Sequence, residues 1–206
     1  MAIESRQGAF GRYYGSTFAS SEALTQTQME ANATYIYRYF RLRGWSINAI
    51  CGMLGNMQAE SSLNPGSWES DNVGNRSGGY GLVQWTPCSN YFEWCGSLDP
   101  SRMDINLSRI EYEFDNNIQY YPTSEYPETF QEFSTSTKSP EYLATAFLKN
   151  YERARVEVLD KRIDYANKWF EFLTGVDPSI PSISSNKRKK FNFLLFNKRR
   201  LIYGKR

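Results

Sequence analysis

The sequence feature that most constrains the fold is a helix expected over residues 46–61. Its apolar residues recur every three or four positions, which is the spacing of one helix face; they are Trp45, Ala49, Ile50, Met53, Leu54 and Met57. Ser46 is a good N-cap residue, and Asn64-Pro65-Gly66 is a strong breaker that stops the helix. We therefore expect Glu60 at the C-terminal end of a largely buried helix, beside a sharp turn.

The rest of the chain is expected to be mainly helical as well. Apolar spacing predicts helices over residues 27–43, 89–96 and 102–119, around 130–133, from 140 onward, and over 156–173. Ser139 and Pro140 form a typical helix start, and Thr27 with Glu30 has the spacing of a capping box. Residues 65–81 are rich in Gly, Ser and Asn, so we expect loop or a small β-hairpin there.

These patterns divide the chain into three parts. We expect an irregular N-terminal arm over residues 1–24, a helical domain over 25–175, and a linker with a C-terminal extension over 176–206. The predicted fold class is mainly α (α+β), with one small loop or hairpin lobe.

The 206-residue chain contains no histidine, which excludes Ser-His, Cys-His and histidine–metal mechanisms within it. Any chemistry is expected from carboxylates, hydroxyls or backbone groups, with no metal and no cofactor. The three cysteines, Cys51, Cys88 and Cys95, do not suit a disulfide framework because their number is odd. A Cys88–Cys95 bridge that closes a short loop is kept as an alternative.

Charge is distributed unevenly along the chain. Residues 1–177 carry a net charge of −7, whereas residues 178–206 hold nine Lys and Arg and no acidic residue. The basic extension could contact DNA, an anionic wall polymer, another protein or a membrane surface. The acidic body argues against DNA binding as the main role, because it would repel phosphate. No stretch approaches the ~20 apolar residues of a membrane span.

Glu60 is the first candidate for chemistry. Burial beside Met57 would favour its protonated form, as a general acid requires. A glycine-rich stretch, residues 78–85, follows it, and a strand there would present Tyr80 and Gln84 with Trp85 nearby. Amide and aromatic groups together suit sugar rings, which have hydroxyl edges and apolar faces.

A third candidate lies at the end of a later helix. Tyr151 could donate a hydrogen bond into the same cleft, and the adjacent Glu152 and Arg153 could form a structural ion pair.

Taken together, these motifs resemble the phage tail lysozymes, a branch of the superfamily of lysozymes and soluble lytic transglycosylases. The resemblance covers about residues 27–175. The matching stretches are Gly44-Trp45-Ser46, residues 50–58, Glu60-Ser61, Asn64-Pro65-Gly66, residues 81–87 and Tyr151-Glu152-Arg153.

The resemblance implies a lysozyme-like fold and a function in the virion, at the tail tip, together with other proteins of the tail knob and tube. It implies a glycosidase that cleaves the β-1,4 bond between N-acetylmuramic acid and N-acetylglucosamine in the peptidoglycan glycan strand during wall penetration and genome entry. Glu60 would be the catalytic acid. The implied substrate-binding residues are Ser61, Tyr80, Gln84, Trp85 and Tyr151.

The second catalytic group is left open by the sequence. A hydrolase needs a carboxylate that orients water, and Asp71 or Glu69 in the loop could supply it. Asp71 could equally serve only to turn the chain. A lytic transglycosylase needs neither, because a hydroxyl of the substrate attacks. Glu111 and Glu113 are expected to be surface charges of a helix.

Two alternatives come from other functional classes. The chain could be a structural plug of the tail tube that keeps the fold without the activity. It could also be a nucleic-acid-binding virion protein, an interpretation that depends on the basic extension alone.

Overall fold

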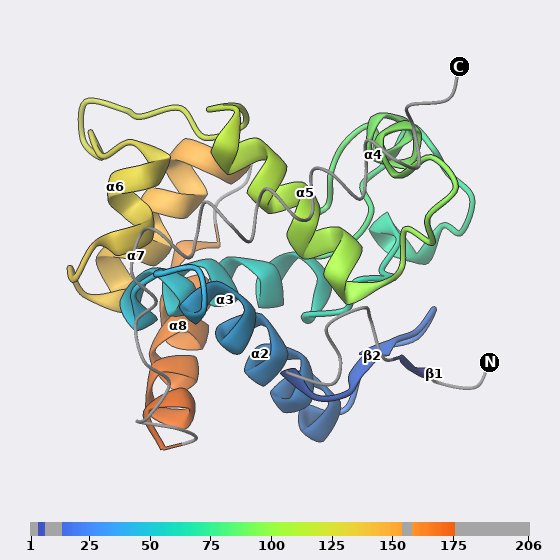
Figure 1. Cartoon of the computed structure of the whole chain (residues 1–206), viewed down its shortest axis with the longest axis horizontal. Coiled ribbons are helices and arrows are strands. Elements are labelled where there is room, and N and C mark those ends of the chain that lie inside the picture. Colours follow the sequence, from blue (N-terminus) through green and yellow to red (C-terminus); the bar gives the residue numbers. More distant parts are fainter. Residues whose placement is uncertain (1–3, 7–13, 154–157, 176–206) are drawn as a thin grey trace.

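The computed structural model describes residues 4–6, 14–153 and 158–175, and these are mainly helical, as predicted (Figure 1). The strands are β1 (Glu4–Arg6) and β2 (Thr17–Ala19), and the α-helices are α2 (Gln26–Arg41), α3 (Ile47–Ser61), α4 (Cys88–Cys95), α5 (Met103–Asp115), α6 (Phe130–Thr135), α7 (Pro140–Phe147) and α8 (Leu159–Thr174). A short 3₁₀ helix, η1 (Glu69–Asp71), and a π-helical turn, η2 (Leu148–Glu152), complete the set. Within the described ranges, no helix combines the length and apolarity needed to cross a bilayer.

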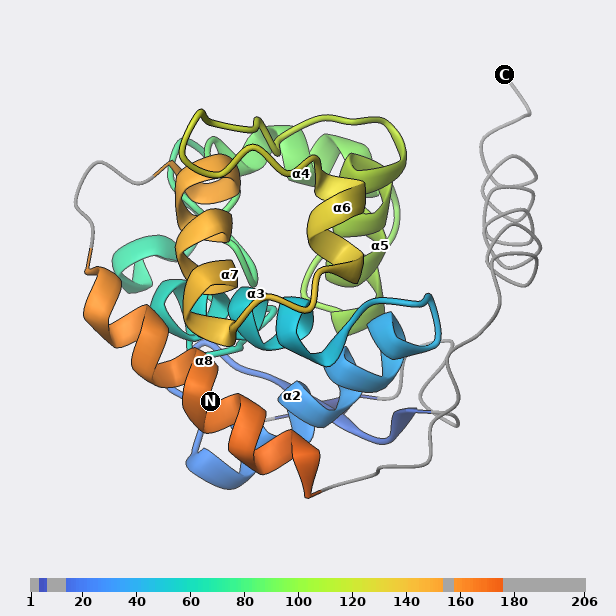
Figure 2. The ribbon, with the colours of Figure 1, turned by 90° about the vertical axis from the view of Figure 1, so that its left-hand side faces the viewer.

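Helix α3 is the centre of the fold. It packs chiefly against α8 and α7 and also contacts α2 and α6 (Figures 1 and 2). Two glycines permit this close approach: a Cβ at Gly52 would lie 2.7 Å from the main-chain carbon of Leu143, and one at Gly55 would lie 2.3 Å from the carbonyl oxygen of Arg162. The backbones of α7 and α8 can therefore come this close to α3 only because these positions lack side chains.

The predicted starts of α3 and α7 are confirmed. The Ser46 hydroxyl accepts a hydrogen bond from the backbone N–H of Ala49 at 3.0 Å, and α3 ends at Ser61, before the predicted breaker. Helix α7 begins at Pro140 behind the cap residue Ser139. Since both starts depend on residues within four positions of each other, local sequence was sufficient to predict them.

The start of α2 and the end of α5 differ from the prediction for clear physical reasons. The capping box of α2 is formed by Thr25 and Gln28, whose side chains each bond the other's backbone N–H, and not by the pair that begins at Thr27. Thr25 and Gln28 form the same two hydrogen bonds that were expected of Thr27 and Glu30, and the helix gains two residues at its start. Helix α5 ends at Asp115, short of residue 119, because the chain turns at Asn117 with φ of 53°.

The segment before α2 contains structure where an irregular arm was predicted. Strands β1 and β2 pair antiparallel. The side-chain oxygen of Asn32 in α2 accepts a hydrogen bond from the Phe18 N–H at 2.8 Å. Its amide nitrogen donates to the carbonyl of Phe18 at 2.8 Å and to that of Leu63 at 2.9 Å. Asn64 donates to the carbonyl of Ser20 at 2.8 Å. These two amides hold the segment against the C-terminal end of α3.

The loop lobe between α3 and α4 is held by aromatic side chains. Isolated backbone bridges join Tyr80 to Trp68 and to Trp85, and the Trp85 ring stacks on Tyr91 with centroids 4.4 Å apart. The strand predicted within residues 78–85 is wrong, because the chain turns over residues 81–84 and Gln84 has φ of 50°. Of the two forms predicted for this lobe, a loop or a small β-hairpin, the loop is therefore the correct one.

The alternative disulfide is not formed. Cys88 and Cys95 lie at the two ends of α4, and both are buried free thiols, as is Cys51. Burial raises the pKa of the Cys51 thiol, which keeps it protonated and unreactive.

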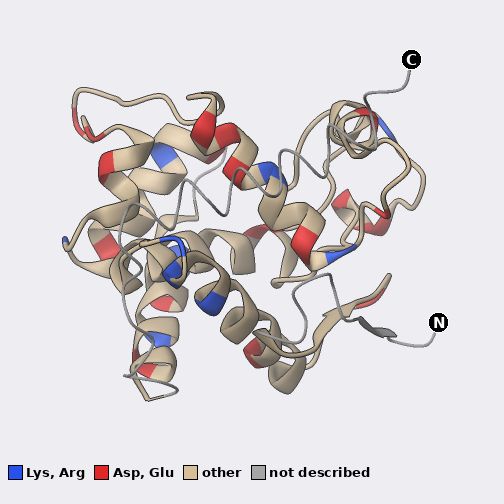
Figure 3. Cartoon of the chain, in the orientation of Figure 1, with Lys and Arg blue, Asp and Glu red and all other residues tan. Residues whose placement is uncertain are grey.

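Asp and Glu residues are distributed over α5, α6 and the loop that carries η1 (Figure 3). This distribution agrees with the negative charge of residues 1–177. The basic extension lies outside the described residues, so contact of that segment with DNA or an anionic wall polymer stays a prediction.

Gly55→Ala tests the close approach of α3 and α8. The added methyl group would collide with backbone at 2.3 Å, and overpacking of this kind costs about 1–3 kcal/mol or more. This exceeds the gain of roughly 1 kcal/mol in helix propensity, so we expect a lower Tm in thermal unfolding. Gly175→Ala is the matched control, because its Cβ would meet nothing closer than 3.5 Å. Equal Tm values for the two variants would contradict the close packing.

Candidate active site

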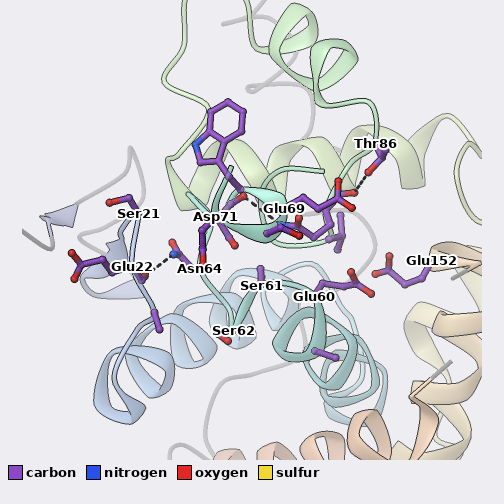
Figure 4. Close-up of a pocket in the computed structure, with 17 residues that line it drawn as sticks. Ser21, Glu22, Glu60, Ser61, Ser62, Asn64, Glu69, Asp71, Thr86 and Glu152 are labelled. Atoms are coloured by element: carbon purple, nitrogen blue, oxygen red, sulfur yellow. Dashed lines mark hydrogen bonds between the residues drawn. The ribbon is translucent and has the colours of Figure 1, made fainter. Parts of the chain in front are cut away.

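A cleft runs along the C-terminal end of α3. It consists of two adjoining cavities of about 1150 Å³ and about 400 Å³, which share Val83, Gln84, Thr86 and Glu152 as lining residues. The larger cavity lies between the end of α3, the loop around η1 and residues 21–23 (Figure 4). The smaller cavity extends toward α5.

Glu60 lies in the last turn of α3 and lines the larger cavity, at the position expected from the sequence. Its Oε1 accepts a hydrogen bond from Arg162 Nη2 at 2.6 Å, and the two side chains are 20% and 7% exposed. Arg162 also donates to the Asn56 side chain at 3.2 Å. The site therefore contains a carboxyl group that a guanidinium holds in place at the edge of the cavity.

Glu152, the last residue of η2, faces Glu60. Figure 4 shows the two carboxyl groups pointing toward one another, from η2 and from α3. The Oε1 atom of Glu152 is buried and has no hydrogen-bond partner among the described residues. Burial, and next to it the charge of Glu60, raises the pKa of Glu152 well above its usual range. Sequence reasoning did not include Glu152 among the site residues.

The predicted ion pair between Glu152 and Arg153 is wrong. Arg153 follows η2 in the left-handed conformation with φ of 50°. Its Nη1 donates to the main-chain oxygens of Gln119 and Asn150, and its guanidinium lies 4.8 Å from the ring centroid of Tyr121. The backbone turn therefore directs the cation to other partners.

Glu113 is also placed differently from the prediction. It is 1% exposed, and its carboxylate accepts hydrogen bonds from Trp85 Nε1 at 2.9 Å, from Arg109 Nε at 2.8 Å and from the Tyr151 hydroxyl. Burial raises the pKa of Glu113, while the three donors act in the opposite direction. The predicted surface charge is thus a buried group that joins α5, the loop lobe and η2.

Glu111, the other residue predicted to be a surface charge, pairs with the buried Arg43 and accepts a hydrogen bond from the Tyr39 hydroxyl at 2.6 Å. Both predictions failed for the same reason. The partners lie on other elements, and the spacing of residues within α5 contains no information about them.

Two of the predicted substrate-binding residues, Ser61 and Gln84, line the larger cavity. Gln84 borders both cavities, and its amide donates to the carbonyls of Gly81 at 3.0 Å and Ser67 at 3.3 Å. Ser61 borders the larger cavity, and its hydroxyl donates to the carbonyl of Leu82 at 3.0 Å. These bonds fix the two walls of the cleft relative to each other.

The three predicted aromatic residues are buried. Trp85 borders the smaller cavity, whereas Tyr80 and Tyr151 line neither of the two cavities. Tyr80 packs among the rings of the loop lobe, and Tyr151 stacks on Phe147 with centroids 4.4 Å apart. Tyr80 and Tyr151 therefore lie behind the cleft surface.

Glu69 and Asp71 lie across the larger cavity from α3 (Figure 4). Glu69 Oε2 accepts a hydrogen bond from the backbone N–H of Gly79 at 2.8 Å, which ties η1 to the glycine-rich stretch. Asp71 is exposed. Among the described residues, no cluster of three His, Cys, Asp or Glu side chains could hold a metal ion.

Comparison with known proteins identifies the family. The model of the phage tail lysozyme family matches residues 31–173, which include α3, the loop lobe and both facing carboxyl groups. The chain belongs to the phage tail lysozyme family. It is also 46% identical over 160 residues to morphogenesis protein 1 of Bacillus phage B103. That alignment covers 77% of this chain and 43% of the relative, so the chain spans less than half of the relative's length. The predicted resemblance is confirmed.

Tyr151→Phe tests the buried network around Glu113. The change removes one of three donors and leaves a buried carboxylate oxygen without it, which costs about 1–3 kcal/mol. We expect a corresponding loss in the free energy of unfolding in urea. Tyr112→Phe on α5, the helix of Glu113, is the control, because Tyr112 is 39% exposed. If both variants were equally stable, the hydrogen bond from Tyr151 would not contribute to the fold.

Proposed function

We propose that this phage tail protein is a glycosidase of the virion that cleaves the β-1,4 bond between N-acetylmuramic acid and N-acetylglucosamine in peptidoglycan. Membership in the phage tail lysozyme family supports this proposal. The observation that carries it is the position of Glu60, a carboxyl group at the end of a buried helix and on the edge of a large cleft. The activity would open the host wall from the tail tip, alongside the proteins of the tail knob and tube, for genome entry.

In this mechanism Glu60 donates a proton to the glycosidic oxygen. The bond to the anomeric carbon then breaks, and its electron pair stays with the leaving oxygen. Gln84, Ser62 and Thr86 border the cleft with amide and hydroxyl groups, which suit the hydroxyl groups of sugars. Trp85, which borders the smaller cavity, and Tyr151, which lies behind the surface, both bond Glu113 and so hold the loop lobe beside η2.

We propose hydrolysis for the second step, with Asp71 as the carboxylate that orients water. Asp71 and Glu69 both border the cavity opposite α3. The Glu69 carboxylate already accepts a bond from the Gly79 N–H, so Asp71 is the better candidate. A transglycosylase would need neither residue.

Glu60→Gln tests the acid. The amide keeps the size of the side chain but supplies no acidic proton, so we expect the rate of wall clearing to fall ~10²-fold or more without loss of fold by circular dichroism. The measurement is turbidity loss of purified peptidoglycan. Glu93→Gln, an exposed site on α4, is the matched control and should clear walls at the wild-type rate. Near wild-type clearing by Glu60→Gln would remove Glu60 from the mechanism. If the wild type itself cleared no walls, the protein would be a structural plug.

Asp71→Asn tests the second step. If Asp71 orients water, its loss should reduce clearing by ~10²-fold or more, and mass spectrometry of wild-type products should find reducing ends. Glu69→Gln should reduce clearing much less. Anhydro ends, together with wild-type clearing by both variants, would identify a transglycosylase instead.

A further inference from the structure

We propose that Glu152 holds the proton that Glu60 delivers, so that the two carboxyl groups work as one proton-sharing pair. The inference rests on the proposed function of Glu60 as the acid. Glu152 does not touch the substrate bond itself; it acts through Glu60, by holding the proton in position.

The arrangement of Glu60 alone leaves a difficulty. A general acid must carry a proton at the working pH, yet Arg162 Nη2 lies 2.6 Å from Glu60 Oε1, and both side chains are largely buried. This contact occupies one oxygen of Glu60 with a guanidinium, so a proton on Glu60 has to sit on the other oxygen. A proton source must therefore lie close to the other oxygen of Glu60.

Glu152 has the geometry of that source. Its carboxyl group points toward that of Glu60 (Figure 4) and borders both cavities, so the pair lies where the cavities join. The buried Oε1 atom of Glu152 has no hydrogen-bond partner in the described part of the chain. An ionised carboxylate with an unpartnered buried oxygen is costly, whereas a protonated one can donate a hydrogen bond to the carboxylate opposite.

The charges around Glu152 support the same assignment. Of the described groups, Glu60 on α3 and Glu113 on α5 raise its pKa, while Arg162 on α8 and the adjacent Arg153 lower it. Burial has the largest effect, and it raises the pKa well above the usual range. Two carboxyl groups that share one proton titrate as a pair, and such a pair keeps its proton over a wide pH range.

The proton balance closes over one turnover. Glu152 passes its proton to the Glu60 oxygen that is not bonded to Arg162 and becomes a carboxylate. Glu60 protonates the glycosidic oxygen as the bond to the anomeric carbon breaks, and the electron pair remains on the leaving oxygen. The attacking hydroxyl, from water or from the sugar itself, loses one proton as it bonds to the anomeric carbon. That proton restores the pair.

The test is the pH profile of wall clearing by the full chain. In the wild type, activity should fall as the pH rises through the raised pKa of the pair, because the last shared proton is then lost. In Glu152→Gln, Glu60 beside Arg162 has no shared proton. The alkaline limb of the profile, where activity falls with rising pH, should therefore move to lower pH by at least about one unit. One unit corresponds to about tenfold lower activity above the limb, while activity on the acidic side should stay within about threefold of the wild type.

The control is Glu125→Gln, which neutralises an exposed carboxylate in the loop before α6. Its profile should coincide with that of the wild type. A merely structural role for Glu152 would reduce activity by the same factor at every pH and leave the limb in place. That result would overturn the inference.

A second measurement remains informative if Glu152→Gln fails to fold. Carboxyl ¹³C NMR titration of the wild type should show a Glu resonance that titrates well above the others, and it should titrate at lower pH in Glu60→Gln, because the neighbouring charge is gone. If no carboxyl group of the wild type titrates late, or if the late one does not respond to Glu60→Gln, the two groups do not share a proton. This readout is independent of wall clearing, so it separates the inference from the proposed function, which would fail if Glu60→Gln cleared walls normally.

Discussion

The close contact between α3 and α8 at Gly55 is the constraint on which the site depends. The carbonyl of Arg162 packs against Gly55, and the guanidinium of the same residue reaches Asn56 and Glu60. One residue therefore links the packing of the two helices to the charge of the site. Arg162 is 6% exposed, and its guanidinium donates hydrogen bonds to both Asn56 and Glu60.

The parts of the structure that could be predicted are local in sequence. The apolar spacing of α3, its Ser46 cap and its end before Pro65 lie within one segment, and they place Glu60 correctly. The environment of Glu113 could not be predicted in this way. Its partners Trp85 and Tyr151 lie 28 and 38 residues away in the sequence, and nothing in the spacing of α5 indicates that they meet there.

The N-terminal segment shows a different limit. Strand β2 has three residues, which is too short for an alternating pattern to stand out from loop. Its position depends on the buried amide of Asn32, while Asn64 holds the residues that follow it. Because residues 21–23 line the larger cavity, these two amides, which the sequence does not distinguish from ordinary polar residues, also shape one end of the cleft.

Glu113 and Glu152 show how the same residue type takes two roles in one buried region. Glu113 has three donors directed at its carboxylate, and the arrangement fixes the loop lobe against α5 and η2. Glu152 has a buried oxygen without a donor in the described residues and faces another carboxyl group. The first arrangement stabilises a fold, because every lone pair that is bonded lowers the cost of burial. The arrangement of Glu152 lowers the stability of the fold unless its carboxyl group carries a proton. A fold that places such a group at the junction of two cavities, next to Glu60, has an arrangement suited to chemistry and not to packing.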